Sequence, residues 1–150
     1  MSRVSNVEHL TFVPRRCVAV SLAIGSLNLN ILNVHNYMFT AQQVAGIGRH
    51  LANWQSRTVL DPKRNFSMVL GDLNFPGAND RVFNPCVISE SEVVEIPIHF
   101  STLHFKWKSV LSNWTELVQP LPTHFNPRGP SLKRLDRAWV DMPAHLIGKI

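Results

Sequence analysis

The chain has 150 residues, which is enough for one compact domain and too few for two of ordinary size. With 45% hydrophobic and 17% charged residues, its composition excludes a disordered or low-complexity protein. The net charge of +5 suits an anionic partner such as nucleic acid, although many ordinary domains are equally basic.

Neither a membrane span nor a secretory leader is expected. No stretch approaches the roughly 20 apolar residues that a membrane helix needs. The apolar segment that follows two early arginines is interrupted by Asn28 and Asn30, so a strand hairpin explains it better than a signal peptide. Cys17 and Cys86 form neither a CxxC pair nor a zinc pattern. We therefore expect an intracellular chain with reduced thiols, and one disulfide stays open as an alternative.

The first predicted elements are two strands joined by a tight turn. Residues 18–24 have a β-rich composition, and Gly25-Ser26 suits a two-residue hairpin turn. The next stretch, residues 27–36, reads "LNLNILNVHN" and is apolar on both faces at its middle. That pattern predicts a strand inside a layered fold, with a polar end where the strand emerges.

A helix and a buried strand follow. Thr40 and Gln43 have capping-box spacing, which predicts a helix start. Residues 56–65 are interpreted as a polar connection, and residues 66–70 as the next strand. The helix between them carries one apolar stripe, made by Val44, Ile47, Leu51 and Trp54. This order predicts an α/β fold with a helix covering the sheet.

The second half of the chain is predicted to hold one more helix and two more strands. Aromatic and apolar residues at helical period predict a helix over residues 104–118, with its aromatic side chains in the core. A short strand at 123–125, a turn at 126–130 and a final strand at 135–140 follow.

Polar clusters stand at three of the predicted strand ends: "NVHN" (33–36), "GDLNF" (71–75) and "RLDRAWV" (134–140). Strand ends are where an α/β fold builds a site from distant segments. If the strand continues through residue 74, Asp72 and Asn74 point the same way. A carboxylate beside an amide suits metal-assisted phosphodiester hydrolysis.

Each of these residues also has an ordinary structural interpretation. Asp72 and Asn74 can simply close a strand, and a single histidine such as His35 is more often structural than catalytic. Asp136, with arginines close on both sides, is typical of a salt-bridged strand. The joint pattern of the three clusters is what favours a functional site.

Together and in this order, "ILNVHN", "MVLGDLNF" and "THFNPRGPSLKRLDRAWV" resemble the endonuclease/exonuclease/phosphatase superfamily. The third segment is especially similar to the endonuclease domain of non-LTR retrotransposon polyproteins. The resemblance covers about residues 10 to 140. It implies a partial DNase I-like four-layer α/β sandwich, in which mixed, mostly antiparallel sheets are covered by helices.

The resemblance also implies roles for individual residues. Asp72 would orient and help deprotonate the attacking water, and Asn74 would hold the scissile phosphate. His35 would stabilise charge at the phosphate, and Asp136 would orient a partner histidine. Mg²⁺ or Mn²⁺ would be held by Asp72 and Asn74. The residues implied in substrate binding are Asn33, Asn36, Asn126 and Arg134.

Two parts of the family pattern do not appear. Glu8 is the only acidic residue before His35, and it lies in "NVEHL" rather than in the family's metal-binding motif. No "SDH" follows Asp136, and His145 is a poor substitute. We therefore expect residues 1–150 to be a single truncated domain, with open strand edges and apolar faces through which copies could associate.

Three functions stay open at this point. One is metal-dependent phosphodiester hydrolysis of endonuclease type, with DNA as the substrate, impaired by the missing parts. Another is an inactive retroelement-derived remnant that binds nucleic acid weakly. The third is a plain α/β interaction domain. The sequence favours the first as the lineage and the second as the present state, with no membrane partner.

Overall fold

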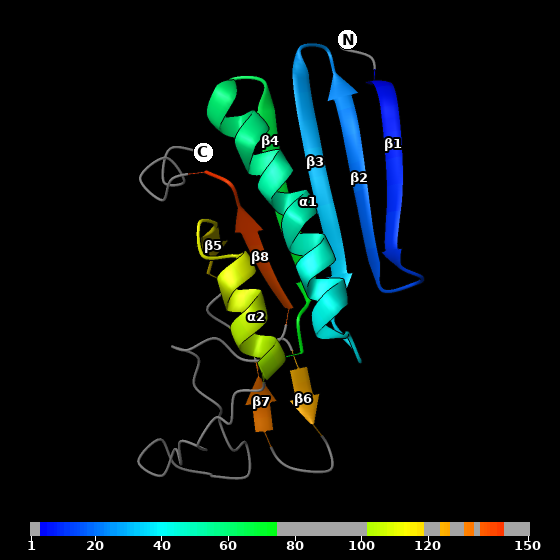
Figure 1. The fold of residues 1–150 in the computed structure, drawn as a ribbon, viewed down its shortest axis with the longest axis vertical. Helices are drawn as coiled ribbons and strands as arrows, with labels where there is room; N and C mark the ends of the chain where they lie inside the picture. The colour runs from blue at the N-terminus through cyan, green and yellow to red at the C-terminus, as the bar shows by residue number, and fades with distance from the viewer. Residues whose placement is uncertain (1–3, 75–101, 119–123, 127–130, 134–135, 143–150) are drawn as a thin grey trace.

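The computed structural model describes residues 4–74, 102–118, 124–126, 131–133 and 136–142. These residues form a six-stranded sheet, a separate two-stranded ribbon and two helices (Figure 1). The sheet order is β1 (Val4–Val13), β2 (Cys17–Ile24), β3 (Leu27–His35), β4 (Asn65–Asp72), β8 (Asp136–Val140) and β5 (Thr115–Leu117). The helices are α1 (Ala41–Leu60) and α2 (Thr102–Val110), and the ribbon is β6 (His124–Asn126) with β7 (Ser131–Lys133). Neither described helix is long and apolar enough to cross a membrane.

The sheet is mixed and mostly antiparallel, as predicted. Among the described strand pairs, only β3 and β4 run parallel, with α1 as the connection between them. A parallel pair needs such a crossover, because its second strand must start at the same end as the first. The predicted hairpin at Gly25-Ser26 and the strand after residue 65 are both confirmed.

The start of α1 and its buried stripe are also confirmed. Thr40 Oγ1 accepts the backbone N–H of Gln43 at 3.2 Å, and Gln43 Oε1 accepts the backbone N–H of Thr40 at 2.8 Å. This reciprocal capping box satisfies two donors that the first turn leaves unpaired. The stripe of Val44, Ile47, Leu51 and Trp54 is buried, with each side chain at most 2% exposed.

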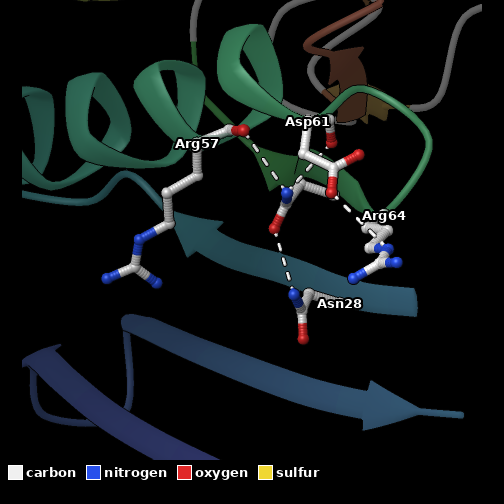
Figure 2. A network of polar contacts seen from close by, with 5 residues as sticks. Asn28, Arg57, Asp61 and Arg64 are labelled. Atoms are coloured by element: carbon white, nitrogen blue, oxygen red, sulfur yellow. Dashed lines mark hydrogen bonds and ion pairs between the residues drawn. The ribbon is translucent and has the colours of Figure 1, made fainter. Parts of the chain in front are cut away.

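The predicted end of α1 is wrong, because the helix continues to Leu60. Asn65 explains the longer helix (Figure 2). Its Nδ2 donates to the carbonyl of Arg57 in the last turn at 3.3 Å and to that of the C-cap residue Asp61 at 3.0 Å, and so reinforces the backbone bonds that end the helix. Its Oδ1 accepts from Asn28 Nδ2 at 3.1 Å, which fixes the helix end to the start of β3.

The helix predicted over residues 104–118 is wrong in its second half. α2 ends at Val110, the chain turns over residues 111–114, and β5 pairs with β8. Leu111 and Trp114 are buried in that turn, so their spacing reflects the core and not a continuous helix. Thr115 Oγ1 donates to the carbonyl of Met142 at 2.7 Å, which adds to the strand pairing. Long-range pairing has overridden local periodicity here.

The two faces of the sheet differ. Both described helices lie on the same side (Figure 1), and on that side the strand residues are buried. The opposite side, which we call the open face, carries half-buried apolar side chains along its middle strands. Those of β2, β3 and β4 are Val18, Val20, Leu22, Leu29, Ile31, Phe66, Met68 and Leu70.

Candidate functional site

Three of the predicted site residues lie side by side on three neighbouring strands. His35 of β3 is level with Asp72 of β4, and Asp72 is level with Asp136 of β8. Laterally paired residues project to the same face of a sheet, with strands about 4.8 Å apart. We call these three residues the strand-end row. It lies at the end of the open face, because its neighbours Val34 and Arg137 are buried on the helix side.

Gly71 allows β4 to approach β3 this closely. Its φ is +133°, a backbone conformation that side-chain-bearing residues rarely adopt. A Cβ at this position would overlap the Val34 carbonyl, well inside van der Waals contact. The glycine before Asp72 is therefore required by the backbone, and it sets the carboxylate level with His35.

Asn74 does not continue the strand. β4 ends at Asp72, and Asn74 is in the left-handed conformation with φ of 55°, so the shared direction predicted for the two side chains is wrong. Asp72 Oδ1 instead accepts the backbone N–H of Asn74 at 2.8 Å. Asn74 Nδ2 donates to the carbonyl of Asn36 at 3.0 Å. The turn after β4 is thus fastened to the loop after β3.

Asn36 lies beneath the strand-end row with one acceptor unused. Its backbone N–H donates to the Asp72 carbonyl at 2.7 Å, and its Nδ2 donates to the Leu73 carbonyl at 2.7 Å. The side chain is 5% exposed, and among the described residues its Oδ1 has no hydrogen-bond partner. Leaving a buried acceptor unpaired costs about 1–3 kcal/mol. An ordered water is the usual partner of such an atom in folded proteins.

The other predicted site residues are less closely grouped. Asn33 is exposed on the open face, two residues before His35. Asn126 lies in β6, and its side chain is outside the described part, as is all of Arg134. Arg137 points to the helix side, where its Nη2 donates to Glu116 Oε2 at 2.5 Å. It therefore does not share a face with Asp136.

The described residues do not complete a metal site by themselves. They contain no group of three or more His, Cys, Asp or Glu side chains that could hold a metal ion. Mg²⁺ prefers about six oxygen ligands in octahedral geometry. Among the three residues of the strand-end row, Asp72 and Asp136 supply carboxylates, and two carboxylates are fewer ligands than such an ion needs. The prediction that Asp72 and Asn74 hold the metal stays a prediction.

The surroundings of the strand-end row favour anions. α1 begins at Ala41, after its N-cap Thr40 and the loop that follows β3, and its first turn contains no acidic residue. Helix N-termini carry partial positive charge, which stabilises nearby negative charge. Arg16 adds a full positive charge close to His35: its carbonyl accepts the N–H of His35 at 2.6 Å, and its guanidinium donates to the carbonyl of Tyr37 at 2.6 Å.

Arg16 and Tyr37 were not singled out by the sequence. The Arg16 guanidinium donates to the Tyr37 carbonyl at 2.6 Å and lies 5.1 Å from the centre of the Tyr37 ring. The sequence signal that could have pointed to Tyr37 is its position directly after the polar cluster "NVHN". Only the register of β2 on β3 places Arg16 there, through the pair of Cys17 and Val34.

Comparison with known proteins supports the fold. No protein-family model matches the chain, and no curated protein sequence matches it. Among solved structures, the 3'-5' exonuclease NExo of Neisseria meningitidis has a TM-score of 0.54 and 18% identity, over 93% of this chain and 59% of that one. The Neisseria 3' phosphatase NExo bound to a product DNA hairpin has a TM-score of 0.56 and 17% identity, with the same coverage.

A non-LTR retrotransposon protein is also among the matches. The endonuclease domain of the telomere-specific element TRAS1 has a TM-score of 0.46 and 12% identity, over 89% of this chain and 54% of that one. That likeness is too distant to assign a subfamily. The chain spans just over half the length of these structures. Over that span it has the DNase I-like α/β fold, which confirms the predicted fold class.

Proposed function

We propose that the strand-end row belongs to a phosphodiester-hydrolysing site of a DNase I-like nuclease, with DNA as its substrate and residues 1–150 as one domain. The observation that carries the proposal is the register that sets His35, Asp72 and Asp136 level on three strands. The fold alone does not require an imidazole and two carboxylates to lie level with one another at this strand end, next to the buried Asn36.

Each side chain of the strand-end row is positioned for one role in phosphodiester hydrolysis. Asp72 uses Oδ1 to hold the Asn74 N–H, and no described contact uses Oδ2. That oxygen can accept a proton from a water that attacks phosphorus. The bond to the leaving oxygen then breaks, and His35, exposed at one side of Asp72, stabilises the charge that develops. Asp136, on the other side, orients a partner group.

The proposal includes a divalent cation, Mg²⁺ or Mn²⁺, which would neutralise phosphate charge when bound. Asp72 alone is a weak anchor for such an ion, because hard cations need several oxygen ligands. We therefore expect low activity from the 150-residue chain, together with salt-sensitive binding of nucleic acid through its net charge of +5.

Plasmid nicking by the purified chain tests the proposal, with Mg²⁺, with EDTA and with Asp72→Ala. Losing the general base should lower the rate by about 100- to 10,000-fold. Asp61→Ala is the matched control, because Asp61 pairs with the exposed Arg64 at 3.6 Å near the start of β4, at the other end of the strand. Nicking that needs Mg²⁺ and Asp72 but not Asp61 supports the proposal.

Other outcomes favour the alternatives. Salt-sensitive DNA binding without nicking supports the inactive remnant. A folded chain that neither nicks nor binds DNA supports a plain interaction domain and contradicts the proposal.

A further inference from the structure

An aromatic ring stands exposed beside the strand-end row. Tyr37 is 53% exposed, and its backbone N–H donates to the His35 carbonyl at 2.9 Å. The centres of the His35 and Tyr37 rings lie 6.3 Å apart, and the two ring planes are inclined by 32°. Tyr37 therefore extends the row on the His35 side with an aromatic residue that is partly exposed to solvent.

Arg16 holds this ring in place. The backbone carbonyl of Arg16 accepts the His35 N–H at 2.6 Å, and the Arg16 guanidinium donates to the Tyr37 carbonyl at 2.6 Å. The guanidinium also lies 5.1 Å from the ring centre, within the range of a cation–π contact. Arg16 thus fixes His35 and Tyr37 relative to each other.

The loop that carries Tyr37 is anchored on both sides. Before it, Asn36 is buried. After it, Phe39 is 7% exposed and its ring lies 6.4 Å from that of Trp107. Between these anchors Met38 has a left-handed φ of 57° and is 76% exposed. A side-chain-bearing residue in that conformation is uncommon, and here it keeps both Tyr37 and Met38 turned outward.

A fixed exposed ring beside phosphate-handling groups is the arrangement that stacks a nucleobase. Stacking on an aromatic side chain is worth about 1–3 kcal/mol per base, and it accepts any base. Phosphoinositides and sugar phosphates have no flat ring to use it. We propose that Tyr37, held by Arg16, stacks an unpaired nucleobase next to the scissile phosphate, so that the substrate is nucleic acid with a single-stranded or unstacked nucleotide. This inference rests on the function proposed above.

Two oligonucleotides separate base contacts from phosphate contacts. One is a short labelled oligothymidylate, and the other has the same length with every base removed. Both are titrated by fluorescence anisotropy in EDTA, which prevents cleavage. We expect the wild-type chain to bind the thymidylate about 5- to 100-fold more tightly than its abasic counterpart, from the energy of one stacked base. Tyr37→Ala should remove that difference and leave abasic binding unchanged.

Two variants serve as controls. Tyr37→Phe keeps the ring and should keep the preference for bases. Leu60→Ala removes an 85% exposed apolar side chain at the far end of α1 and should change neither affinity. Thermal melting of each variant shows that it is folded, so a lost preference reports on the ring and not on unfolding.

The inference is overturned if the wild type binds both oligonucleotides equally, or if Tyr37→Ala weakens both by the same factor. Plasmid nicking separates this failure from failure of the proposed function. Nicking without a preference for bases contradicts only the role of Tyr37. A base preference that needs Tyr37, found without nicking, supports the stacking role and contradicts the proposed hydrolysis.

Discussion

Asp72 of β4 and Asp136 of β8 stand directly opposite each other in an antiparallel ladder. Like charges in directly opposed positions destabilise a sheet. Gly71, immediately before Asp72, holds a backbone conformation that other residues avoid, and Asn36 leaves a buried oxygen unpaired among the described residues. A strained glycine, a buried unpaired acceptor and two facing carboxylates thus gather at one strand end.

Replacing Asp72 by asparagine should stabilise the fold and, under the proposed function, abolish the proposed hydrolysis. The amide keeps an oxygen that can accept the Asn74 N–H, and it removes one of the two facing charges. The expected gain in the free energy of unfolding is about 0.2–1 kcal/mol. Urea denaturation at low and high salt measures it, and the gain should shrink at high salt because screening already weakens the repulsion.

The control for this change is Asp61→Asn, which removes a carboxylate that faces Arg64 and not another acid. It should bring no gain in stability, since exposed pairs of this kind contribute little. If Asp72→Asn is instead less stable than the wild type, Asp72 contributes to the fold and the functional interpretation of the row loses support.

Gly71→Ala should be strongly destabilising. The new Cβ would meet the carbonyl of Val34, and neither backbone can move without breaking the β3–β4 pairing. With an unfavourable φ of +133° as well, we expect a loss of about 3 kcal/mol or more. Gly46→Ala is the matched control, because its Cβ would approach only Arg49 Nη2, at 3.9 Å.

These two alanine substitutions should act in opposite directions. Gly46 lies inside α1, where alanine is favoured over glycine by about 0.5–1 kcal/mol. Chemical denaturation of both variants therefore distinguishes a backbone requirement at residue 71 from a general effect of replacing glycine. Equal midpoints for Gly71→Ala and the wild type would contradict the close approach of β3 and β4.

The parts of the fold that could be predicted are those with local signals. The hairpin turn, the capping box at Thr40 and the stripe from Val44 to Trp54 each depend on neighbouring residues, and all are confirmed. The helix beyond Val110 was wrong because pairing of β5 with β8 decides that segment. The end of α1 was missed because its cap comes from Asn65, beyond the turn that follows the helix.

In the candidate site, too, the features with local sequence signals could be predicted and those set by long-range pairing could not. Each polar cluster could be assigned to a strand end, but the register that sets His35 level with Asp72 depends on pairing between distant segments. The direction of the Asn74 side chain could not be inferred, because side chains alternate between the two faces only within a strand, and Asn74 has a left-handed backbone conformation. The contact of Arg16 with Tyr37 joins the start of β2 to the end of β3, and no local pattern encodes it.

Acid should destabilise the protein through its partly buried histidines. Burial, and secondly the Arg57 charge, lowers the pKa of His50 below its ordinary value. Burial, then Lys108 and Arg137, likewise lowers the pKa of His104. The unfolded chain therefore binds more protons, so stability is complete above about pH 6.5 and falls as the pH drops through the lowered pKa values.

His50 can be tested directly. Its ring contacts Phe12 and Trp54 edge-on, with centres 5.1 and 4.7 Å away. His50→Leu should make the urea midpoint less sensitive to acidification, whereas His9→Gln, at an exposed position on β1, should leave the wild-type acid response unchanged. The same response in wild type and His50→Leu would show that His50 does not contribute to it.

Cys17 should react with thiol reagents only when the chain opens. It is a free thiol with 0% exposure, and burial raises its pKa to about 12. Because the thiolate is the reactive form, labelling at mildly alkaline pH should be slower than for an exposed cysteine by about 1,000-fold or more. The measurement uses Cys86→Ser, which leaves Cys17 as the only thiol, and compares labelling in buffer with labelling in denaturant.

The labelling rate also reports on the docking of α1. Cys17 pairs with Val34 on the helix side of the sheet, within the same buried cluster as Val44 and Leu51 of α1. Its labelling therefore requires opening of that layer, and the dependence of the rate on denaturant gives the free energy of the opening. Slow labelling that accelerates only with global unfolding means that helix and sheet form one cooperative unit. Rapid labelling in buffer would mean that α1 leaves the sheet readily, and the strand-end row would then lack a stable support.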